Sequence, residues 1–488
     1  MEDPGEESNL VVDGNAAAIP EEGSRPPGRG LFILEPPIFL ISFALNVSTA
    51  VFTDQLVYQA CVVSLGINQT ECDKLGKEYE SPEVQALEAR VQPYSADILM
   101  AESLADSILP AFMNLFIGPW SDRFGRKPVL LLTFIGCTLS HLLITVICAL
   151  SSWYRLDPWY YAISFVPSAL SGATCTMLTS VFCYIADVTS EQERGNKMSV
   201  MEAALYSGML VGNISSSFIL RLTNAFTVFA ISTGSSMLAV LYIAFSVKES
   251  VQITEEDRCE SCCSKLRFLF RPRMVLDTFK TCFSWRSNYG RAIILIGILT
   301  LGGNIFAIES NNTVFFLFVR KQFNWAVRKY SFYSSTETVL LVMGNLLATY
   351  ILERLIGLTE AGIASIGFFS WMVNSIAIAV ASEPWHLYLA IAICTLKGVT
   401  DPMTRAFISN GAPPEAIGSI FSFSTTFEAL MPLGAAPLYT IVYKHTLEYS
   451  PGTFSWISAG VYGLCYCLTM SVCILQSMSS NSHYPSID

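Results

Sequence analysis

Charged side chains are scarce in this chain: only 14% of its 488 residues are Asp, Glu, Lys or Arg, whereas 52% are hydrophobic. A soluble domain cannot bury apolar surface in that proportion, so the composition excludes an ordinary soluble protein. The sequence also lacks a nucleotide-binding loop and the Cys and His spacing of a metal site, and we therefore expect no cofactor and no bound metal. The net charge of −11 arises mostly from the N-terminal tail and one predicted outer loop, and it gives no indication of a nucleic-acid partner.

The chain does contain apolar runs, each long enough to cross a lipid bilayer as a helix of roughly 20 residues. They form two sets of six, separated by a polar stretch. The runs cover residues 36–58, 96–119, 129–151, 159–184, 198–221 and 225–247, and then 292–318, 333–352, 359–381, 386–409, 416–442 and 453–476. This pattern predicts an all-α polytopic membrane protein with 12 transmembrane helices in two six-helix bundles that rock about a central site.

The predicted domain order follows from these runs. It comprises a disordered cytoplasmic tail (1–30), an N-terminal bundle (31–247), a cytoplasmic central loop (248–291), a C-terminal bundle (292–476) and a second cytoplasmic tail (477–488). The first tail is acidic and rich in Gly and Pro, without a basic start or an apolar core. It is therefore predicted to be disordered and not to be a signal peptide.

Positive charges set the expected orientation in the membrane. The central loop carries nine Lys or Arg residues, and an even number of spans places both tails on the same side as this loop. Because cytoplasmic loops are enriched in Lys and Arg, that side is predicted to be the cytoplasm. Four basic residues on the predicted outer side oppose the rule; they are either an entry patch for an anionic solute or charges carried across by neighbouring spans. These are Arg320, Lys321, Arg328 and Lys329.

The loop between the second and third runs is the most informative motif. Gly125 would let the chain reverse within a few residues. Asp122 lies among three cations, and an ion pair that forms in one conformation and breaks in the other is what a gate requires. The alternative is a solvated turn whose charges only set the topology, and the position between two apolar runs favours the gate. The loop reads Gly118-Pro119-Trp120-Ser121-Asp122-Arg123-Phe124-Gly125-Arg126-Lys127.

This loop resembles the G-x-x-x-D-R-x-G-R-K signature of the major facilitator superfamily of secondary transporters. The stretch from Tyr184 to Gly195 resembles the A-D-x-x-x-x-x-x-R-G turn of the same superfamily. The resemblance implies that Asp187 and Arg194 act with the Asp122 loop as a cytoplasmic gate. The segment from Leu352 to Gly357 resembles the Asp122 loop more weakly, at the corresponding place in the second half. It has Glu in place of the expected Asp and lacks the basic cluster, so the gate is expected to be asymmetric.

Ionisable residues inside the predicted spans are candidates for transport chemistry, because burying a charge is costly without a partner or a function. In span ten, Lys397, Asp401 and Arg405 recur at every fourth position and are predicted to share one helical face. Pro402 would break that helix and free a backbone carbonyl. Lys397 and Arg405 are therefore candidate contacts for an anionic substrate, and Asp401 is a candidate proton carrier. The alternative is a structural ladder of ion pairs.

Glu202, near the start of span five, is the other candidate proton carrier. A carboxyl that faces a cavity of low dielectric constant could bind a proton from the acidic side and release it on the other. It could equally be a surface glutamate paired with Lys197 or Arg194. Other acidic residues lie in or near the spans, and the sequence does not show which face a cavity: Asp54, Glu102, Asp106, Glu309, Glu337 and Glu428.

Two cysteines fall in the first predicted outer loop. Cys61 and Cys72 could form a local disulfide in the loop that also holds the Asn68-Gln69-Thr70 glycosylation sequon. Most of the other cysteines lie in apolar runs, where a thiol behaves as a small hydrophobic group. A cluster in the central loop could be palmitoylated, or could bind a metal with a partner. It consists of Cys259, Cys262 and Cys263.

Short segments in both halves together resemble the proton-coupled folate transporter family, solute carrier family 46. They are Glu35-Pro36-Pro37-Ile38-Phe39-Leu40, the Trp120 to Pro128 loop, Ala186-Asp187-Val188, and Pro402 with Arg405. The resemblance implies import of anionic solutes with protons. It assigns Arg405 to substrate and proton coupling, Glu202 to the coupling carboxylate, and Asp122 with Arg126 to the gate. Ala173 replaces the acidic residue that the folate branch has in span four, so folate itself does not follow.

These patterns together predict a secondary active transporter and not an enzyme. Its expected activity is proton-coupled symport of a small organic anion, folate-like or muropeptide-like, toward the cytosol by alternating access. The alternatives are a pH-independent uniporter or exchanger and a transporter-like receptor or scaffold. The tail contains Tyr484-Pro485-Ser486-Ile487, which resembles a lysosomal sorting signal, although such short matches are common. We rank the plasma membrane above the lysosomal or endosomal membrane, and the sequence gives no oligomeric state.

Overall fold

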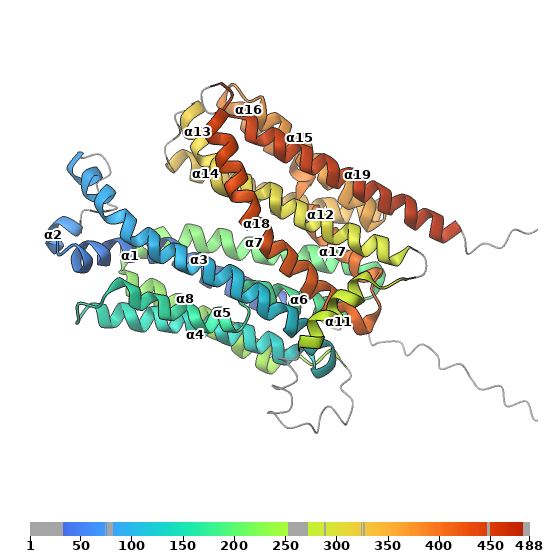
Figure 1. The fold of residues 1–488 in the computed structure, drawn as a ribbon, viewed down its shortest axis with the longest axis horizontal. Coiled ribbons are helices and arrows are strands. Elements are labelled where there is room, and N and C mark those ends of the chain that lie inside the picture. The colour runs from blue at the N-terminus through green and yellow to red at the C-terminus, as the bar shows by residue number, and fades with distance from the viewer. Residues whose placement is uncertain are drawn as a thin grey trace, which may run out of the picture.

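The chain is described by a computed structural model that covers residues 33–73, 75, 82–251, 272–286, 289–323, 325, 327–446 and 449–481. All regular structure in these residues is helical (Figure 1). The predicted tail 1–30, the Tyr484 motif and the cysteine cluster at positions 259, 262 and 263 lie outside them.

The N-terminal half consists of the helices coloured blue to green in Figure 1. Long helices alternate in direction, and the fourth predicted span is assembled from three short consecutive pieces. The elements are α1 (Glu35–Gln59) continued by η1 (Ala60–Ser64), α2 (Gln69–Cys72), α3 (Pro82–Phe124), α4 (Arg126–Ser151), η2 (Pro158–Phe165), α5 (Val166–Leu170), α6 (Ala173–Val188), α7 (Glu191–Leu222) and α8 (Ala225–Ser246).

The C-terminal half follows the central loop and is coloured yellow to red. Its elements are α11 (Pro272–Phe283), α12 (Gly290–Ser310), η3 (Asn311–Phe315), α13 (Phe316–Phe323), α14 (Val327–Ala348), η4 (Thr349–Leu355), α15 (Glu360–Ala379), α16 (Pro384–Ile393), η5 (Thr395–Val399), α17 (Thr400–Asn410), η6 (Pro414–Ala416), α18 (Ile417–Thr446) and α19 (Thr453–Asn481). Thus α19 continues past residue 476, where the predicted bundle ends, and α11 occupies part of the predicted central loop.

Nine helical segments among the described residues are long and apolar enough to cross a membrane. The other three predicted spans correspond to α3, to α18 and to the interrupted series α16, η5 and α17. The interruption has a local cause, because Pro402 lies in the first turn of α17 and has no N–H to continue a helix from η5. Span ten is therefore two helices joined by a 3₁₀ segment.

The two halves pack together mainly at one end, which we call the gate end because it contains the Asp122 loop. One continuous apolar cluster crosses between the halves there, with Met198 from α7, Met403 from α17 and Phe421 from α18 among its buried members. Toward the opposite end the packing separates into smaller clusters, each of which lies within one half. Contacts between α3 and α18, and between α7 and α17, join the halves. The structure is therefore closed at the gate end.

Candidate functional site

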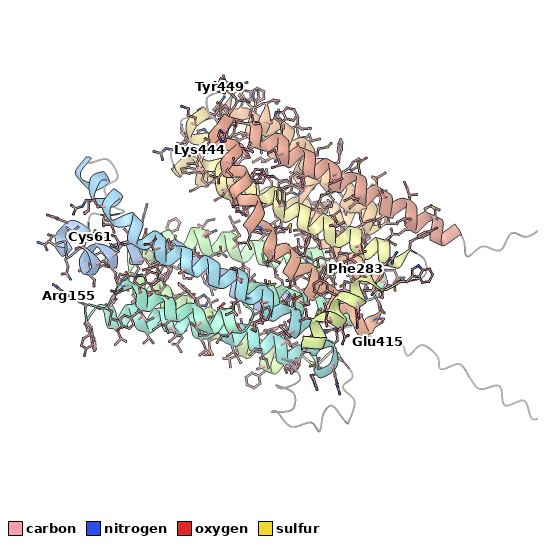
Figure 2. The ribbon with its side chains drawn as sticks, in the orientation of Figure 1. Cys61, Arg155, Phe283, Glu415, Lys444 and Tyr449 are labelled. Carbon is pink, nitrogen blue, oxygen red and sulfur yellow. A yellow bond between two sulfur atoms is a disulfide. The ribbon has the colours of Figure 1, made fainter. Side chains whose placement is uncertain are left out.

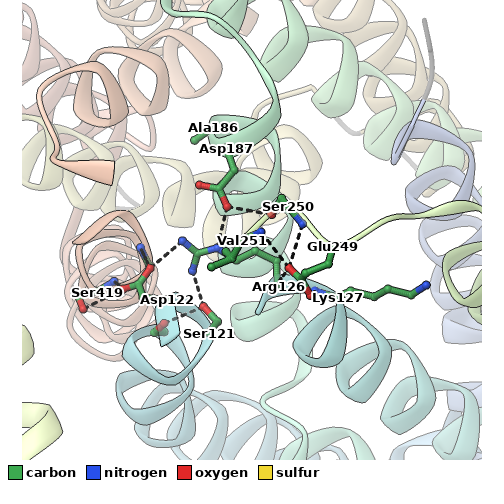
Figure 3. Close-up of polar contacts among 12 residues, drawn as sticks. Ser121, Asp122, Arg126, Lys127, Ala186, Asp187, Glu249, Ser250, Val251 and Ser419 are labelled. Carbon is green, nitrogen blue, oxygen red and sulfur yellow. Dashed lines mark hydrogen bonds and ion pairs between the residues drawn. The ribbon is translucent and has the colours of Figure 1, made fainter. Parts of the chain in front are cut away.

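Asp122 joins the two halves at the gate end by binding the start of a helix in the other half. Its carboxylate accepts hydrogen bonds from the backbone N–H groups of Gly418 (2.8 Å) and Ser419 (3.0 Å), which begin α18 (Figure 3). The first N–H groups of a helix have no partner within the helix, and the helix dipole favours a negative charge at this position. Asp122 thus acts as a capping carboxylate supplied by the opposite half.

Arg126 holds Asp122 in this position. Its guanidinium contacts Asp122 Oδ1 at 2.7 Å and Asp187 Oδ2 at 3.0 Å, and it donates to Ser121 Oγ at 2.6 Å. Glu249, which follows α8, accepts from the backbone N–H groups at the start of α4, including that of Arg126 at 2.7 Å. The carboxylates of α3 and α6 therefore meet on one buried arginine (Figure 3).

Two glycines of the gate are required by space or by backbone conformation. A Cβ atom on Gly118 would lie 2.2 Å from Ser422 Cβ, so α3 and α18 could not approach as closely with any larger residue. Gly125 has a φ of +107°, a conformation that favours glycine, and allows the chain to turn between α3 and α4. The other two predicted gate cations point elsewhere: Arg123 lies over the Phe124 ring, and Lys127 donates to the Ala244 carbonyl.

A second connection between the halves lies beside α7. Arg194 donates to Asn410 Oδ1 at 2.5 Å and to the Ala186 carbonyl at 2.8 Å, so it links the end of α6 to the end of α17. Ser199 on α7 lies 2.9 Å from the Thr349 hydroxyl. Arg194 is thus placed at the gate end, where its bond to Asn410 forms a connection in addition to the bonds that Asp122 makes with Gly418 and Ser419.

The centre of the molecule contains a buried ion pair between α17 and α18. Arg405, 4% exposed, contacts both oxygens of Glu428, with Nη2 at 2.5 Å from Oε2 and Nη1 at 3.2 Å from Oε1. The guanidinium also lies over the Phe182 ring of α6, 4.2 Å from its centroid. A bidentate pair that also stacks is the geometry that arginine makes and lysine cannot. Arg405 Nε remains without a hydrogen-bond partner among the described residues.

Two more carboxyl groups complete this central cluster, which we define as Glu202, Asp401, Arg405 and Glu428. Asp401 accepts a hydrogen bond from Asn304 Nδ2 at 2.6 Å. Glu202 on α7 interacts electrostatically with the other three members, but no described residue forms a hydrogen bond to its carboxyl group. Its side chain is buried, with 7% of its surface exposed. The cluster spans both halves, because α7 belongs to the N-terminal half and α17 and α18 to the C-terminal half.

Lys397 does not share a face with Asp401 and Arg405 as the spacing predicts. Its amine forms an ion pair with Glu337 of α14 and lies 4.5 Å from the centroid of the Trp371 ring. Trp371 in turn stacks on Tyr462 of α19 with centroids 5.1 Å apart. The reason is the 3₁₀ segment η5, whose three residues per turn shift Lys397 away from the face that an α-helix would give it.

The first outer loop contains a disulfide between Cys61 and Cys72. Asn68 lies between these cysteines, immediately before α2, and its side chain is exposed. The sequon is therefore accessible from solution at the end opposite the gate.

Several contact residues were not identified from the sequence. Asn114 of α3 donates to the Ser422 carbonyl and the Thr425 hydroxyl, and the backbone N–H of Ser419 donates to Asp122 at the gate. The sequence signal that could have identified Asn114 is its polar side chain inside an apolar run. Glu337 and Glu428 were recognised as intramembrane acids, but their partners are 60 and 23 residues away and no local spacing indicates them.

Comparison with known proteins agrees with this architecture. Residues 95–436 match the Major Facilitator Superfamily. The chain is 30% identical over 448 residues to the probable peptidoglycan muropeptide transporter SLC46 of Drosophila melanogaster, covering 91% of this chain and 86% of that protein. It is 22% identical to the proton-coupled folate transporter of Rattus norvegicus over 88% of this chain and 89% of that one. It is 21% identical to the lysosomal proton-coupled steroid conjugate and bile acid symporter SLC46A3 of Gallus gallus, covering 92% of each.

Solved structures show the same fold. The human organic anion transporter MFSD10 (TETRAN) superposes with a TM-score of 0.61 at 14% identity, covering 89% of this chain and 99% of that one. The proton:xylose symporter XylE superposes with a TM-score of 0.62 at 12% identity, covering 90% and 94%. The chain is therefore a polytopic membrane transporter, not an enzyme, and it belongs to the major facilitator superfamily and, within it, to solute carrier family 46.

Proposed function

We propose that this protein is a proton-coupled symporter that moves a small organic anion toward the cytosol by alternating access. The observation that carries the proposal is the composition of the central cluster, in which three carboxyl groups surround one guanidinium. If all were ionised, three negative charges and one positive charge would leave a net charge of −2 in the interior of a membrane protein. Unbalanced buried charge is costly, so this cluster favours binding a proton.

Glu202 is the member best suited to carry that proton. Glu428 is held by both terminal nitrogens of Arg405, and Asp401 is held by the Asn304 amide, whereas no described residue forms a hydrogen bond to Glu202. Glu202 also belongs to the half opposite to Arg405. A rocking motion of the halves would therefore change its distance from the arginine and alter the cost of its ionised form, which couples the proton to the conformation.

Arg405 is the proposed contact for the anionic group of the substrate. In the structure Glu428 occupies both of its terminal nitrogens, as a carboxylate of a substrate would. Exchange of one carboxylate for another would preserve the bidentate geometry and keep the buried guanidinium paired. The Phe182 ring against the guanidinium would remain as a fixed wall of the site.

The relatives support an organic anion as the substrate class. Their names give a muropeptide, folate, and steroid conjugates with bile acids as the solutes of those proteins. Muropeptides, folates and bile acids all carry carboxylate groups. A muropeptide-like anion is the substrate that we place first, because the Drosophila melanogaster protein named for muropeptides shares 30% identity with this chain over 448 residues.

The test is uptake of a labelled muropeptide and of labelled folate by cells that express the chain, at acidic and at neutral external pH. We expect uptake to rise as external pH falls, because protons then load Glu202 from outside. The Glu202→Gln variant, which mimics the protonated carboxyl, should lose this pH dependence. Glu309→Gln is the matched control, because Glu309 lies on α12 outside the central cluster and should keep the wild-type profile.

Two results would contradict the proposal. Uptake that is equal at both pH values in the unmodified chain would favour a uniporter or exchanger with the same fold. A pH profile unchanged in the Glu202→Gln variant would remove Glu202 from the coupling step.

A further inference from the structure

A polar pocket at the end opposite the gate lies outside the central cluster. It has a volume of about 550 Å³ and is formed within the N-terminal half by the ends of α1 and α4, the start of α8 and the loop that follows α4. This volume falls in the range of roughly 300 to 1,000 Å³ typical of small-molecule sites. In Figure 2, Arg155, which lines the pocket, lies near Cys61 at one end of the molecule. Glu415, which belongs to the gate end, lies at the other end.

The lining of this pocket is rich in neutral hydrogen-bonding groups. Three glutamine amides contribute to it, from Gln55, Gln59 and Gln69, together with the serine at the end of α4 and the serine that follows it. Arg155 is the one charged side chain among the lining residues, and none of them is acidic. Amides that can both donate and accept suit a ligand with many hydroxyl or amide groups, and a lone arginine suits one anionic group.

Gln59 indicates that a polar partner is missing. The residue is 4% exposed, and its amide oxygen Oε1 has no hydrogen-bond partner in the described part of the chain. A buried acceptor without a partner costs free energy unless a donor reaches it. Gln55 lies one helical turn before Gln59 on α1 and lines the same pocket, where its side chain also hydrogen-bonds to Tyr161, so both amides line the space that one ligand would fill.

Aromatic side chains form the rim of the pocket. Trp153 is 84% exposed, and Tyr154 and Phe226 are also exposed. Flat aromatic rings beside amides offer a stacking surface for a sugar ring. An aromatic belt at the membrane surface is the other use of such residues. Trp159 is exposed at the same end but does not line the pocket, so substituting it tests the membrane role without changing the pocket.

We propose that this pocket binds a saccharide that carries one carboxylate, with Arg155 contacting the carboxylate, the glutamine amides contacting hydroxyl or acylamino groups, and Trp153 covering the ring. The proposal does not depend on the transport mechanism, because none of the pocket residues belongs to the central cluster. The sugar can come from solution or from a glycan on Asn68, because Gln69 of the sequon is part of the lining.

The experiment uses the full chain in lipid nanodiscs and measures binding by saturation-transfer NMR. The probes are methyl β-glucuronide and methyl β-glucoside, which differ only in the carboxylate. A hydrogen bond to a charged group typically contributes enough free energy for roughly a tenfold or greater difference in affinity. We expect the glucuronide to bind about tenfold more tightly than the glucoside.

Matched variants assign the contacts. Arg155→Gln should abolish the preference for the glucuronide, while Arg221→Gln, an exposed arginine at the same end outside the lining, should keep it. Trp153→Ala should weaken the binding of both probes, and Trp159→Ala should leave the binding of both unchanged. Gln59→Leu should weaken the binding of both probes. Because Gln59 is buried, this substitution could impair folding; Arg155 lies on an exposed loop, so Arg155→Gln tests the pocket without that risk.

The Asn68→Gln variant identifies the source of the sugar. If the glycan of Asn68 fills the pocket, the probes will bind only to the Asn68→Gln variant. The pocket then still binds a saccharide with a carboxylate, but that saccharide belongs to the protein's own glycan. If the ligand is free, both forms will bind them. Absence of binding to both forms, or binding that Arg155→Gln and Trp153→Ala leave unchanged, would overturn the proposal.

Discussion

At the scale of single residues, the contacts of Arg405 at the centre involve more than its positive charge. Its guanidinium contacts both oxygens of Glu428 and stacks on Phe182. Arg405→Lys would keep the charge but lose one of the two paired hydrogen bonds and the flat stacking surface. We expect substrate uptake to fall by roughly tenfold or more, because one hydrogen bond to a charged group is lost. The measurement is uptake corrected for surface expression. Uptake at the wild-type level in this variant would contradict a role for the two paired hydrogen bonds of the guanidinium.

The pairing of Arg405 with Glu428 gives a separate stability prediction. Removing one partner of a buried pair leaves the other uncompensated, at a typical cost of about 3 to 5 kcal/mol. We therefore expect Arg405→Ala to lower the thermal stability of the purified protein strongly. The double variant with Glu428→Gln should lose less stability than the sum of the two single variants, because both disrupt one interaction. Strict additivity in a double-mutant cycle would show that the two residues do not form a pair in the protein.

At the scale of helices, the close approach of α18 to α3 depends on Gly418. A Cβ atom at this position would lie 2.4 Å from Asp122 Oδ1. We expect Gly418→Ala to weaken closure at the gate end and to lower transport, because the capping carboxylate could no longer reach the start of α18. The matched control is Gly434→Ala in the same helix, where no atom lies within 4 Å of the added Cβ. Equal transport by the two variants would refute the requirement for a glycine at position 418.

The helices also show which parts of the structure a sequence can predict. Length and apolar composition are local properties, so the spans could be located, and the break in span ten follows from Pro402. The position of Lys397 could not be predicted, because a 3₁₀ segment replaced the expected α-helical phase. Its partner Glu337 lies on another helix, and such contacts depend on how helices pack. The gate loop was the exception, because Asp122 and Arg126 are four residues apart and their contact is local.

At the scale of the whole molecule, two of the polar connections between the halves lie at the gate end. One joins Asp122 to α18 and the other joins Arg194 to Asn410. We expect Asp122→Asn and Asn410→Ala each to shift the population toward an open gate, with roughly additive effects because the two substituted side chains lie on different helices and bind different groups. Spin labels at the exposed positions Pro128 and Glu415 report the distance between the halves. A distance distribution that neither variant changes would show that these connections do not hold the gate closed.

The predicted orientation of the molecule can be tested through Asn68. The sequon is exposed at the end opposite the gate, where the charge pattern predicts the outer side of the membrane. We expect the protein from eukaryotic cells to lose apparent mass on treatment with an N-glycosidase, and Asn68→Gln to abolish this change. Asn213→Gln is the control, because that sequon lies within α7. An Asn68→Gln protein that still changes in mass would show that the glycan is attached elsewhere.

The excess of acidic groups in the central cluster has an electrical consequence. If the protein works as the symporter proposed above, then after the proton and the solute have left, three carboxylates and one guanidinium would carry two net negative charges through the return of the empty carrier. Each elementary charge moved across the full membrane potential corresponds to about 2.3 kcal/mol per 100 mV. A voltage that is negative inside would therefore favour the empty carrier with its site toward the outside, so that the membrane potential, as well as the proton gradient, would reset the protein for the next solute.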